Sequence, residues 1–434
     1  MGKHGHNRGT EPEGLCLNVE GKCVAFADCF EPLRNNTYSR AVMTPTAGVA
    51  NIHYGDVLVK YGEVLDFSTA DVPSLLPGTT PVGDELRDGD IVIADTAEDE
   101  TCGRTVEIAN LSSRKAVAGL HTIACRPKPG LFVPGWLGYF MNSVSYHRQL
   151  VPLMAGIKVL SISRTALKGT TILVPPISEQ RQIVAIFSAC DRIVESKQKL
   201  LEEKKRQKRA LMRILLEPEG GDAAFSRVGG TRPEGRTPRK MRPLGSFLDF
   251  KNGINAPKEQ FGSGIKLISV REVLDELPIC YNSIRASVDV PEETIKAYSV
   301  EFGDILIQRS SENAQEAGSC NVYLDTKPAV FGGFVIRGKK KADYNPVFFK
   351  SLLQSQFVRR QIVGRAAGAQ HFNVGQEDLE SIIIPVFRKV EQDRIATIFT
   401  AADREIDGLA REIDAWKEKR KALSQLLLSG KVRV

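Results

Sequence analysis

The chain has 434 residues, of which 42% are hydrophobic and 26% are charged, and its net charge is +7. This length predicts two or three domains, and the composition is that of a globular protein, which excludes disordered, collagenous and low-complexity classes. No apolar run approaches the roughly eighteen residues that cross a bilayer, and no signal-peptide stretch follows the N-terminus, so we expect a cytoplasmic chain with no membrane partner. The eight cysteines form no Cys-x-x-Cys pair, so we expect neither a zinc site nor another cofactor.

Residues 1–178 are expected to form a first globular domain of mixed α/β type. Short β-rich runs bounded by Gly and Asp occur at 56–59 and 91–93, and a helical segment is expected near 133–150. A Gly-led loop, 156–164, then precedes an apolar run that is closed by Pro175. The domain is therefore predicted to end where a long helix begins.

A long helix is predicted over 179–216, where apolar residues recur at helical spacing. Its segment 197–213 holds eight basic and two acidic residues. Because Lys197, Lys204 and Lys208 fall on the apolar seam itself, a solvated helix face does not explain them. Contact with nucleic-acid phosphates and docking to an acidic partner surface remain open as alternatives. The residues predicted to pack against another helix are Ile183, Phe187, Val194, Leu201, Leu211 and Leu215.

The second half of the chain is expected to have the same organisation. A linker rich in Gly, Pro and Arg spans 217–243, and a second α/β domain is predicted over 244–390, with strands near 305–307 and 334–336. A second Gly-led loop, 368–374, precedes a second long helix over 391–430. Its predicted packing residues are Ile395, Phe399, Ile406, Leu409, Ile413, Trp416, Leu423 and Leu427, and Arg420 interrupts this seam.

A tandem duplication underlies this organisation. The segment Glu179–Arg192 reappears as Glu391–Arg404, and the match continues without a gap along both helices. We call the separation of Glu179 from Glu391 the repeat offset. The same offset relates Gly156 to Gly368, whereas the middles of the two domains share almost nothing. The fold class we predict is therefore a tandem pseudo-repeat of an α/β (α+β) domain followed by a long helix, with the two helices packed on each other as a coiled coil.

Catalytic motifs are absent from the sequence. It has no phosphate-binding loop, no His-Glu-x-x-His and no Gly-x-Ser-x-Gly. The Gly-Asp pairs at 55–56, 89–90 and 303–304 are better explained as turns that lead into strands than as acids or metal ligands. Val174-Pro175-Pro176-Ile177 lacks the acid or amide that a methyltransferase loop needs. We therefore expect a protein without catalysis of its own.

The two Gly-led loops carry side chains that suit nucleic acid. Gln and Asn match adenine, whereas Lys and Arg match guanine or phosphate. Residue by residue, an ordinary polar turn before a strand remains the simpler interpretation. The loops are more informative together, because they occur twice, at matched positions ahead of matched helices.

The duplicated layout resembles the specificity subunit of a Type I restriction–modification enzyme. In that family a Pro, a short gap, Glu-Gln, Ile and a long Leu/Lys helix end in Leu-Leu-x-Gly, and this pattern occurs here over 175–216 and 385–430. The resemblance implies that each domain is a target-recognition domain for one half of a bipartite, asymmetric site in double-stranded DNA. It also implies that the helices pair antiparallel, set the spacer between half-sites and dock methylation subunits, usually two, with restriction (motor) subunits joining afterwards.

Two other classes of protein remain as alternatives. A helical scaffold that binds only proteins is the competing class, and an independent nuclease or methyltransferase is a third. A protein-binding scaffold does not explain two divergent domains on a duplicated frame.

The same resemblance and the loop chemistry give a set of candidate DNA contacts. The candidate DNA-binding residues are Lys60, Tyr61, Lys158, Ser161 and Arg164 in the first domain and Arg309, Ser310, Arg365, Gln370, His371 and Asn373 in the second.

Overall fold

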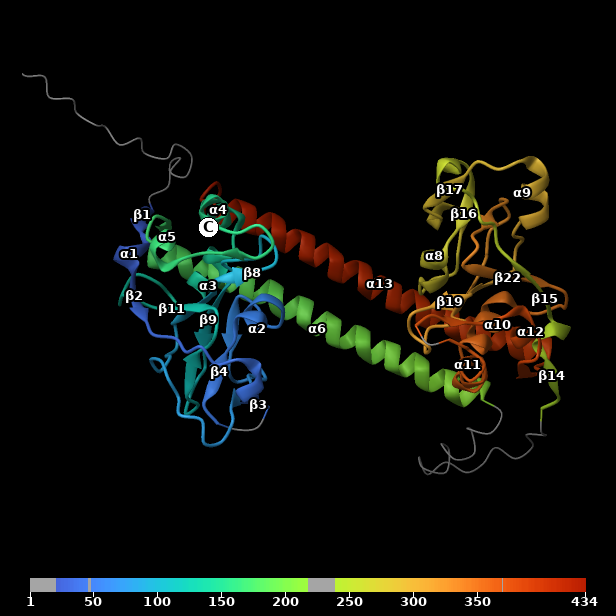
Figure 1. The fold of residues 1–434 in the computed structure, drawn as a ribbon, viewed down its shortest axis with the longest axis horizontal. Helices are drawn as coiled ribbons and strands as arrows, with labels where there is room; N and C mark the ends of the chain where they lie inside the picture. The colour runs from blue at the N-terminus through green and yellow to red at the C-terminus, as the bar shows by residue number, and fades with distance from the viewer. Residues whose placement is uncertain (1–20, 46–47, 218–238, 369) are drawn as a thin grey trace, which may run out of the picture. The chain divides into compact units, whose positions relative to one another are not determined.

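The computed structural model describes residues 21–45, 48–217, 239–368 and 370–434, so most of the predicted linker lies outside the described residues. The chain divides into two compact units (Figure 1). Unit 1 contains residues up to Ser196 together with Asp414–Val434, and unit 2 contains Lys197–Ile413. Two long helices, α6 (Ile177–Leu216) and α13 (Lys389–Leu427), each contribute one part to each unit.

Unit 1 is built around two β-sheets. The larger has the strand order β2-β11-β7-β9-β5 and the smaller β10-β4-β6-β3. Two short pairs, β1 with β13 and β8 with β12, complete the unit. Its strands are β1 (Lys22–Ala25), β2 (Phe30–Leu33), β3 (Met43–Thr44), β4 (Ala50–Ile52), β5 (Val64–Asp66), β6 (Ser74–Leu75), β7 (Ile91–Ala94), β8 (Thr96–Ala97), β9 (Thr105–Ala109), β10 (Ala116–Ala118), β11 (Thr122–Pro127), β12 (Leu160–Ser161) and β13 (Thr171–Val174). Its helices besides the long ones are α1 (Phe26–Cys29), α2 (Tyr54–Val59), α3 (Trp136–Met141), α4 (Val144–Leu150) and α5 (Arg164–Leu167).

Unit 2 repeats the central part of this plan. Its four-stranded sheet has the order β15-β22-β18-β20, and a three-stranded sheet has the order β17-β16-β21. The pairs β14 with β24 and β19 with β23 correspond to the two short pairs of unit 1. The strands are β14 (Met241–Pro243), β15 (Leu248–Asn252), β16 (Phe261–Ile268), β17 (Ala286–Val288), β18 (Ile305–Gln308), β19 (Ser310–Ser311), β20 (Cys320–Val322), β21 (Val330–Phe331), β22 (Val335–Lys340), β23 (Phe372–Asn373) and β24 (Ile383–Pro385). The shorter helices are α8 (Val270–Leu274), α9 (Glu292–Tyr298), α10 (Pro346–Leu353), α11 (Gln356–Val363) and α12 (Gln376–Glu380).

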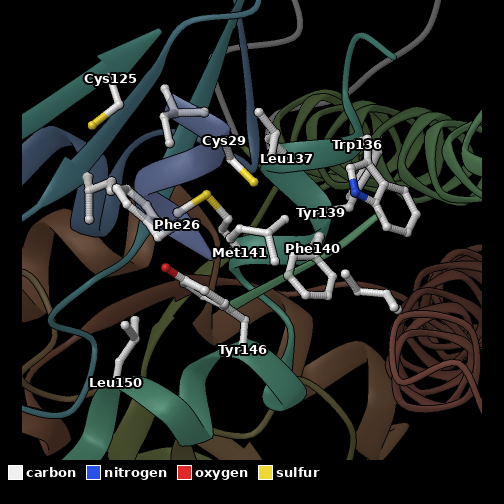
Figure 2. Packing of buried hydrophobic residues seen from close by; sticks show 14 of the residues in the cluster. Phe26, Cys29, Cys125, Trp136, Leu137, Tyr139, Phe140, Met141, Tyr146 and Leu150 are labelled. Atoms are coloured by element: carbon white, nitrogen blue, oxygen red, sulfur yellow. The ribbon is translucent and has the colours of Figure 1, made fainter. Parts of the chain in front are cut away.

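Each unit packs the start of one long helix into its own hydrophobic core. In unit 1, Trp136 and Phe140 of α3 and Tyr146 of α4 are fully buried, and Figure 2 shows them in one cluster with Phe26 and Cys29 of α1. Ile183 and Phe187 of α6 belong to the same cluster. In unit 2, Ile395 and Phe399 of α13 have the equivalent place in a cluster with the aromatic side chains of α10. None of the fourteen residues predicted for helix packing is exposed.

The predicted fold class is confirmed, with one local error. Helices, strands and the duplication occur where the sequence indicated, but the run 56–59 forms helix α2 and not a strand. The His53 ring accepts a hydrogen bond from Gly55 N at 3.2 Å, and buried Asp56 binds Arg40 at 2.9 Å. These contacts stabilise a helical turn whose apolar composition alone favours a strand.

The Gly-Asp pairs of the two sheets form turns, as expected. Gly89 and Gly303 have φ values of 87° and 90°, which favour glycine. Asp90 and Asp304 are buried, and each accepts a backbone hydrogen bond from the residue three positions earlier, at 2.8 and 2.9 Å. These aspartates therefore close turns ahead of β7 and β18.

Candidate nucleic-acid interface

Two equivalent hairpins project from the units, one from each. The unit 1 hairpin covers 155–161, and the unit 2 hairpin covers 367–373, of which 369 lies outside the described residues. Antiparallel bridges close them at Ala155–Ser161 and at Ala367–Asn373. The hairpins are anchored by β12 on β8 and by β23 on β19. The repeat offset found in the sequence therefore relates these two structures residue by residue.

A glycine gives both hairpins the same tight turn. Gly156 has φ = 123° and Gly368 has φ = 142°, values that side chains rarely adopt. A Cβ atom added at either position would lie 1.9 Å from a backbone oxygen, that of Val159 in unit 1 and that of His371 in unit 2. Since Val159 and His371 are also related by the repeat offset, the backbone conformation is shared although the side chains at the tips differ.

A second pair of glycines lets each hairpin pack against its unit. A Cβ atom on Gly103 would lie 2.6 Å from Leu150 and 3.3 Å from Ile162. A Cβ atom on Gly318 would lie 2.3 Å from Ile362, at the equivalent place. Glycine at these two positions therefore allows close packing at the base of each hairpin.

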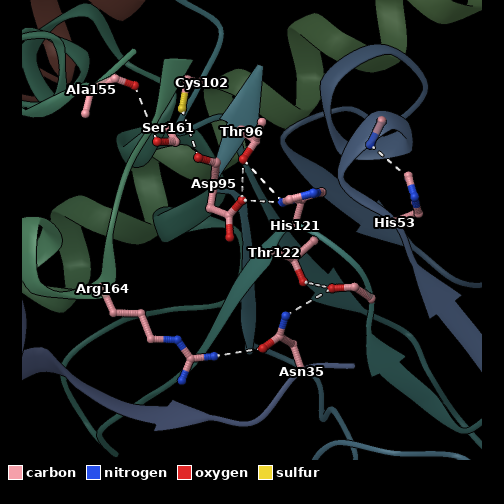
Figure 3. Close-up of polar contacts among 12 residues, drawn as sticks. Asn35, His53, Asp95, Thr96, Cys102, His121, Thr122, Ala155, Ser161 and Arg164 are labelled. Carbon is pink, nitrogen blue, oxygen red and sulfur yellow. Dashed lines mark hydrogen bonds and ion pairs between the residues drawn. The ribbon is translucent and has the colours of Figure 1, made fainter. Parts of the chain in front are cut away.

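Three of the five residues predicted in the first domain lie on or beside the unit 1 hairpin. Lys158 is exposed at the tip, and Ser161 is bonded within the hairpin through its hydroxyl to Ala155 O at 3.3 Å. Arg164 is exposed, and its Nη2 atom donates to Leu33 O at 3.0 Å and to Asn35 Oδ1 at 3.1 Å (Figure 3). These contacts hold the guanidinium in place at the base of the hairpin.

The other two residues predicted in the first domain, Lys60 and Tyr61, lie in different environments. Lys60 is exposed and donates to Asp71 O at 2.5 Å. Tyr61 is only 5% exposed and packs in the second core cluster of unit 1, and its hydroxyl has no hydrogen-bond partner among the described residues. Burial raises the pKa of this hydroxyl well above its usual value. A ring buried in this way cannot meet DNA, so Tyr61 leaves the set of candidate contacts.

The six residues predicted in the second domain cluster around the unit 2 hairpin. Gln370, His371 and Asn373 are exposed on it, and Ser310 binds Asn373 through its hydroxyl. Arg309 is half-buried in the neighbouring segment, between β18 and β19. Its backbone oxygen accepts a hydrogen bond from Val374 N at 3.0 Å. The Arg309 guanidinium forms no hydrogen bond within the part of the chain that the structure describes.

Arg365 is the exception within this group. Its Nε donates to Ser381 Oγ at 3.1 Å and its Nη1 to Gln361 O at 3.0 Å. The side chain thus ties the end of α11 to the segment after α12. A positioning role within unit 2 explains it without DNA.

The structure adds a polar group that the sequence did not single out. Next to the unit 1 hairpin, His121 has φ = 54°, an unusual conformation for histidine. Its ring lies 3.5 Å from Asp95 Oδ1 and 3.4 Å from Thr96 Oγ1 (Figure 3). Thr96 in turn pairs with Ser161 in the β8–β12 ladder. Non-glycine residues with such backbone angles cluster at functional sites, but no local sequence signal marks this one.

The lysines on the seam of α6 pair with acidic residues of α13. Lys204 Nζ lies 2.8 Å from Glu405 Oε2, and Lys197 and Lys208 bind in the same way. The residue numbers of the acidic partners decrease (Glu412, Glu405, Asp403) as the residue numbers of the lysines increase. The two helices are therefore antiparallel within unit 2. Intramolecular partners account for these lysines, and neither external alternative is needed to explain them.

An equivalent but more elaborate ion cluster occurs in unit 1. Arg420 binds Asp191 through Nε and Nη2, and its Nη2 lies 3.0 Å from Glu63 Oε1. Burial alone lowers the Arg420 pKa, but Asp191 and Glu63 more than offset this, so the pKa is raised. The repeat offset relates Lys208 to Arg420 and Asp191 to Asp403, so this cluster is the counterpart of the Lys208–Asp403 pair.

A buried glutamine joins each long helix to its globular part. Gln180 Oε1 accepts from Val133 N at 3.0 Å, and Gln392 Oε1 accepts from Asn345 N at 2.8 Å. Both amides also donate to the backbone oxygen five residues earlier, at 2.9 and 3.0 Å. The repeated Glu-Gln dipeptide therefore fixes the start of each helix and has a structural role.

Curated proteins and solved structures point to one kind of protein. The chain is 24% identical over 361 residues to the putative type I restriction enzyme MjaX specificity subunit of Methanocaldococcus jannaschii, covering 80% of this chain and 79% of the relative. It is 19% identical over 286 residues to the EcoKI specificity subunit of Escherichia coli K12, covering 64% of this chain and 61% of that protein. The chain resembles type I specificity subunits. No family model matches it.

The structural comparison confirms the fold expected from that resemblance. The S subunit of the type I system of M. genitalium superposes with a TM-score of 0.56 at 15% identity, covering 95% of this chain and 97% of that one. A chain from a structural study of complex assembly in a type I R-M system gives 0.55 at 17% identity. No described helix is long and apolar enough to cross a membrane. No group of three or more metal-ligating side chains occurs within the described ranges.

Proposed function

We propose that this chain is the DNA-recognition subunit of a type I restriction–modification complex. Each unit would contact one half of a bipartite, asymmetric DNA site, and the chain itself would carry no catalytic step. The observation that carries this proposal is the pair of hairpins. Their backbone geometry is the same to the level of single glycine contacts, whereas their exposed side chains differ. Recognition of two different sequences by one scaffold requires this combination.

The exposed side chains of the hairpins supply two different kinds of DNA contact. Lys158 in unit 1 is a cation suited to guanine or phosphate oxygens, and Arg164, which is held by Leu33 and Asn35, is a second cation beside the hairpin. Gln370 and Asn373 in unit 2 are amides suited to adenine. A two-stranded ribbon fits the major groove, where all four base pairs can be distinguished. The two half-sites should therefore differ in sequence.

The long helices would dock the partner proteins. Their two starting segments have equivalent glutamine contacts and each contribute an aspartate, Asp191 or Asp403, to a cross-helix ion pair at a position related by the repeat offset. Identical partners require identical surfaces, so we propose two methylation subunits, with restriction subunits joining this assembly. Ile398 of α13 is an exposed apolar side chain, and its counterpart by the repeat offset, Ile186 of α6, is half-buried, so this pair is available for such docking.

The proposal is tested by sequencing adenine methylation in the native genome with this gene intact, deleted and restored. We expect deletion to remove one split motif, two short sequences around a fixed unread spacer, and restoration to recover it. An unchanged methylation pattern would contradict the proposal. Co-purification of protein partners without any salt-dependent DNA shift would then favour a protein-binding scaffold.

A further inference from the structure

The tip of the unit 1 hairpin presents aliphatic side chains to solvent. Ile157 is 101% exposed and Val159 is 51% exposed, and Lys158 lies between them. Single exposed apolar residues are common on protein surfaces and by themselves indicate nothing. Here, however, these side chains are carried by a hairpin whose backbone is fixed by hydrogen bonds.

The backbone beneath Ile157 is fixed at both ends. Ala155 and Ser161 exchange two backbone hydrogen bonds of 2.9 and 2.8 Å, and β12 pairs with β8. Gly156 then places the chain in a turn that a Cβ atom would not allow. Ile157 is also β-branched, so its χ1 angle has little freedom to lose on binding. The backbone that carries Ile157 is therefore fixed, and its fully exposed side chain has few rotamers to choose from.

The hairpin of unit 2 differs in chemistry at this point. By the repeat offset, Ile157 and Lys158 correspond to Ala369 and Gln370. The anchoring positions keep their character, since Ala155 matches Ala367 and Ile162 matches Val374. The larger aliphatic group is thus confined to one of two tips that share the same backbone turn.

We propose that Ile157 recognises the C5-methyl group of a thymine in the half-site contacted by unit 1. This inference rests on the proposed function and specifies what that hairpin recognises. The thymine methyl is the apolar group that a natural base pair presents in the major groove, and aliphatic side chains contact it. Lys158 beside it supplies a cation for a neighbouring guanine or phosphate. Ile157 therefore determines specificity and carries no catalytic role.

The experiment uses the full chain in complex with its methylation subunits and a DNA duplex that contains the methylated motif. Each thymine of the unit 1 half-site is replaced in turn by deoxyuridine, which removes only the methyl group. We expect one replacement to weaken binding about four-fold, the equivalent of about 0.8 kcal/mol for one buried methyl-sized group. Ile157→Ala should weaken binding to the thymine duplex by a similar factor and abolish the response to deoxyuridine.

Matched controls separate the possible outcomes. Val144→Ala changes another exposed aliphatic residue of unit 1 and should leave the response to deoxyuridine intact. A half-site without thymine, no response to deoxyuridine, or an Ile157→Ala variant that still responds would overturn the inference. Loss of methylation subunits from the Ile157→Ala complex, with unchanged DNA affinity, would overturn it in favour of a protein contact. If the unaltered complex recognises no split motif, the proposed function itself fails.

Discussion

The two units keep the same backbone where their side chains have changed. Gly156 and Gly368 make the same turn, Gly103 and Gly318 make the same close approach, and Gln180 and Gln392 make the same helix contact. The tips of the hairpins share neither charge nor size. A duplicated protein can therefore change what it recognises while it conserves the geometry that places the recognising groups. The following predictions test which contacts maintain the shared geometry and which determine recognition.

The largest expected effect comes from the hairpin glycines. Gly156→Ala should lower the free energy of unfolding by about 3 kcal/mol, because a Cβ atom would meet a backbone oxygen in an already strained conformation. Chemical denaturation measures the loss. Gly130→Ala is the control, since Gly130 has φ = 81° but nothing within 4 Å of its Cβ position, and it should lose only about 1 kcal/mol. Equal losses would show that the carbonyl contact is unimportant.

A buried carboxyl group should make stability depend on pH in unit 1. Glu107 is 2% exposed, and burial raises its pKa from 4.5 to about 7, although backbone N–H groups that include Gly138 N at 2.9 Å oppose this. The folded state then holds a proton that the unfolded state loses. Stability from this group is present below about pH 4.5 and is lost as pH rises through about 7, by on the order of 3 kcal/mol.

Glu107→Gln removes this titration. Relative to the unaltered protein, the variant should gain stability as pH rises from 4.5 to 7.5, as denaturation at several pH values would measure. Glu98→Gln, which changes an exposed carboxylate of the same unit, provides the control. A stability difference between Glu107→Gln and the unaltered protein that stays constant over this pH range would refute the assignment.

The two cross-helix ion clusters should differ in strength. Arg420 binds Asp191 through two nitrogen atoms and also contacts Glu63, whereas Lys208 binds Asp403 through one. Double-mutant cycles to alanine should give a coupling energy of about 2 kcal/mol for Arg420–Asp191 and about 1 kcal/mol for Lys208–Asp403. Lys208–Asp403 is the less exposed pair, so the reverse order would mean that burial outweighs the number of hydrogen bonds.

The most local effect concerns a single side chain at one tip. Gln370→Ala should relax sequence choice at one base pair of the unit 2 half-site, by about 1–3 kcal/mol of discrimination, and leave the other half-site unchanged. Motif sequencing of methylated DNA measures this. Lys168→Ala changes an exposed lysine of unit 1 outside the hairpin and serves as the control. Relaxation in both half-sites would break the assignment of one half-site to each unit.

The sequence predicted the parts of the molecule that depend on periodicity and repetition. The long helices and strands β7 and β18 followed from spacing, and the matched positions of the two Gly-led loops followed from the constant offset, although the sequence did not show that these loops form hairpins. It failed where tertiary contacts decide. Helix α2 replaced an expected strand because His53 and Asp56 stabilise its turn, and Tyr61 lies in the core and not at the surface. The unusual backbone of His121 depends on neighbours distant in sequence, so no local pattern could indicate it.

The division of each long helix between two units has a consequence for the order in which the chain is made. Glu179 near the start of α6 binds Arg433 at 2.8 Å, and Leu427 and Leu428 lie in the core of unit 1. Most of unit 1 emerges early from the ribosome, yet its core is completed by residues 414–434. Unit 2, whose residues are contiguous from 197 to 413, has all its parts earlier. The first unit to be synthesised is therefore the last that can be finished.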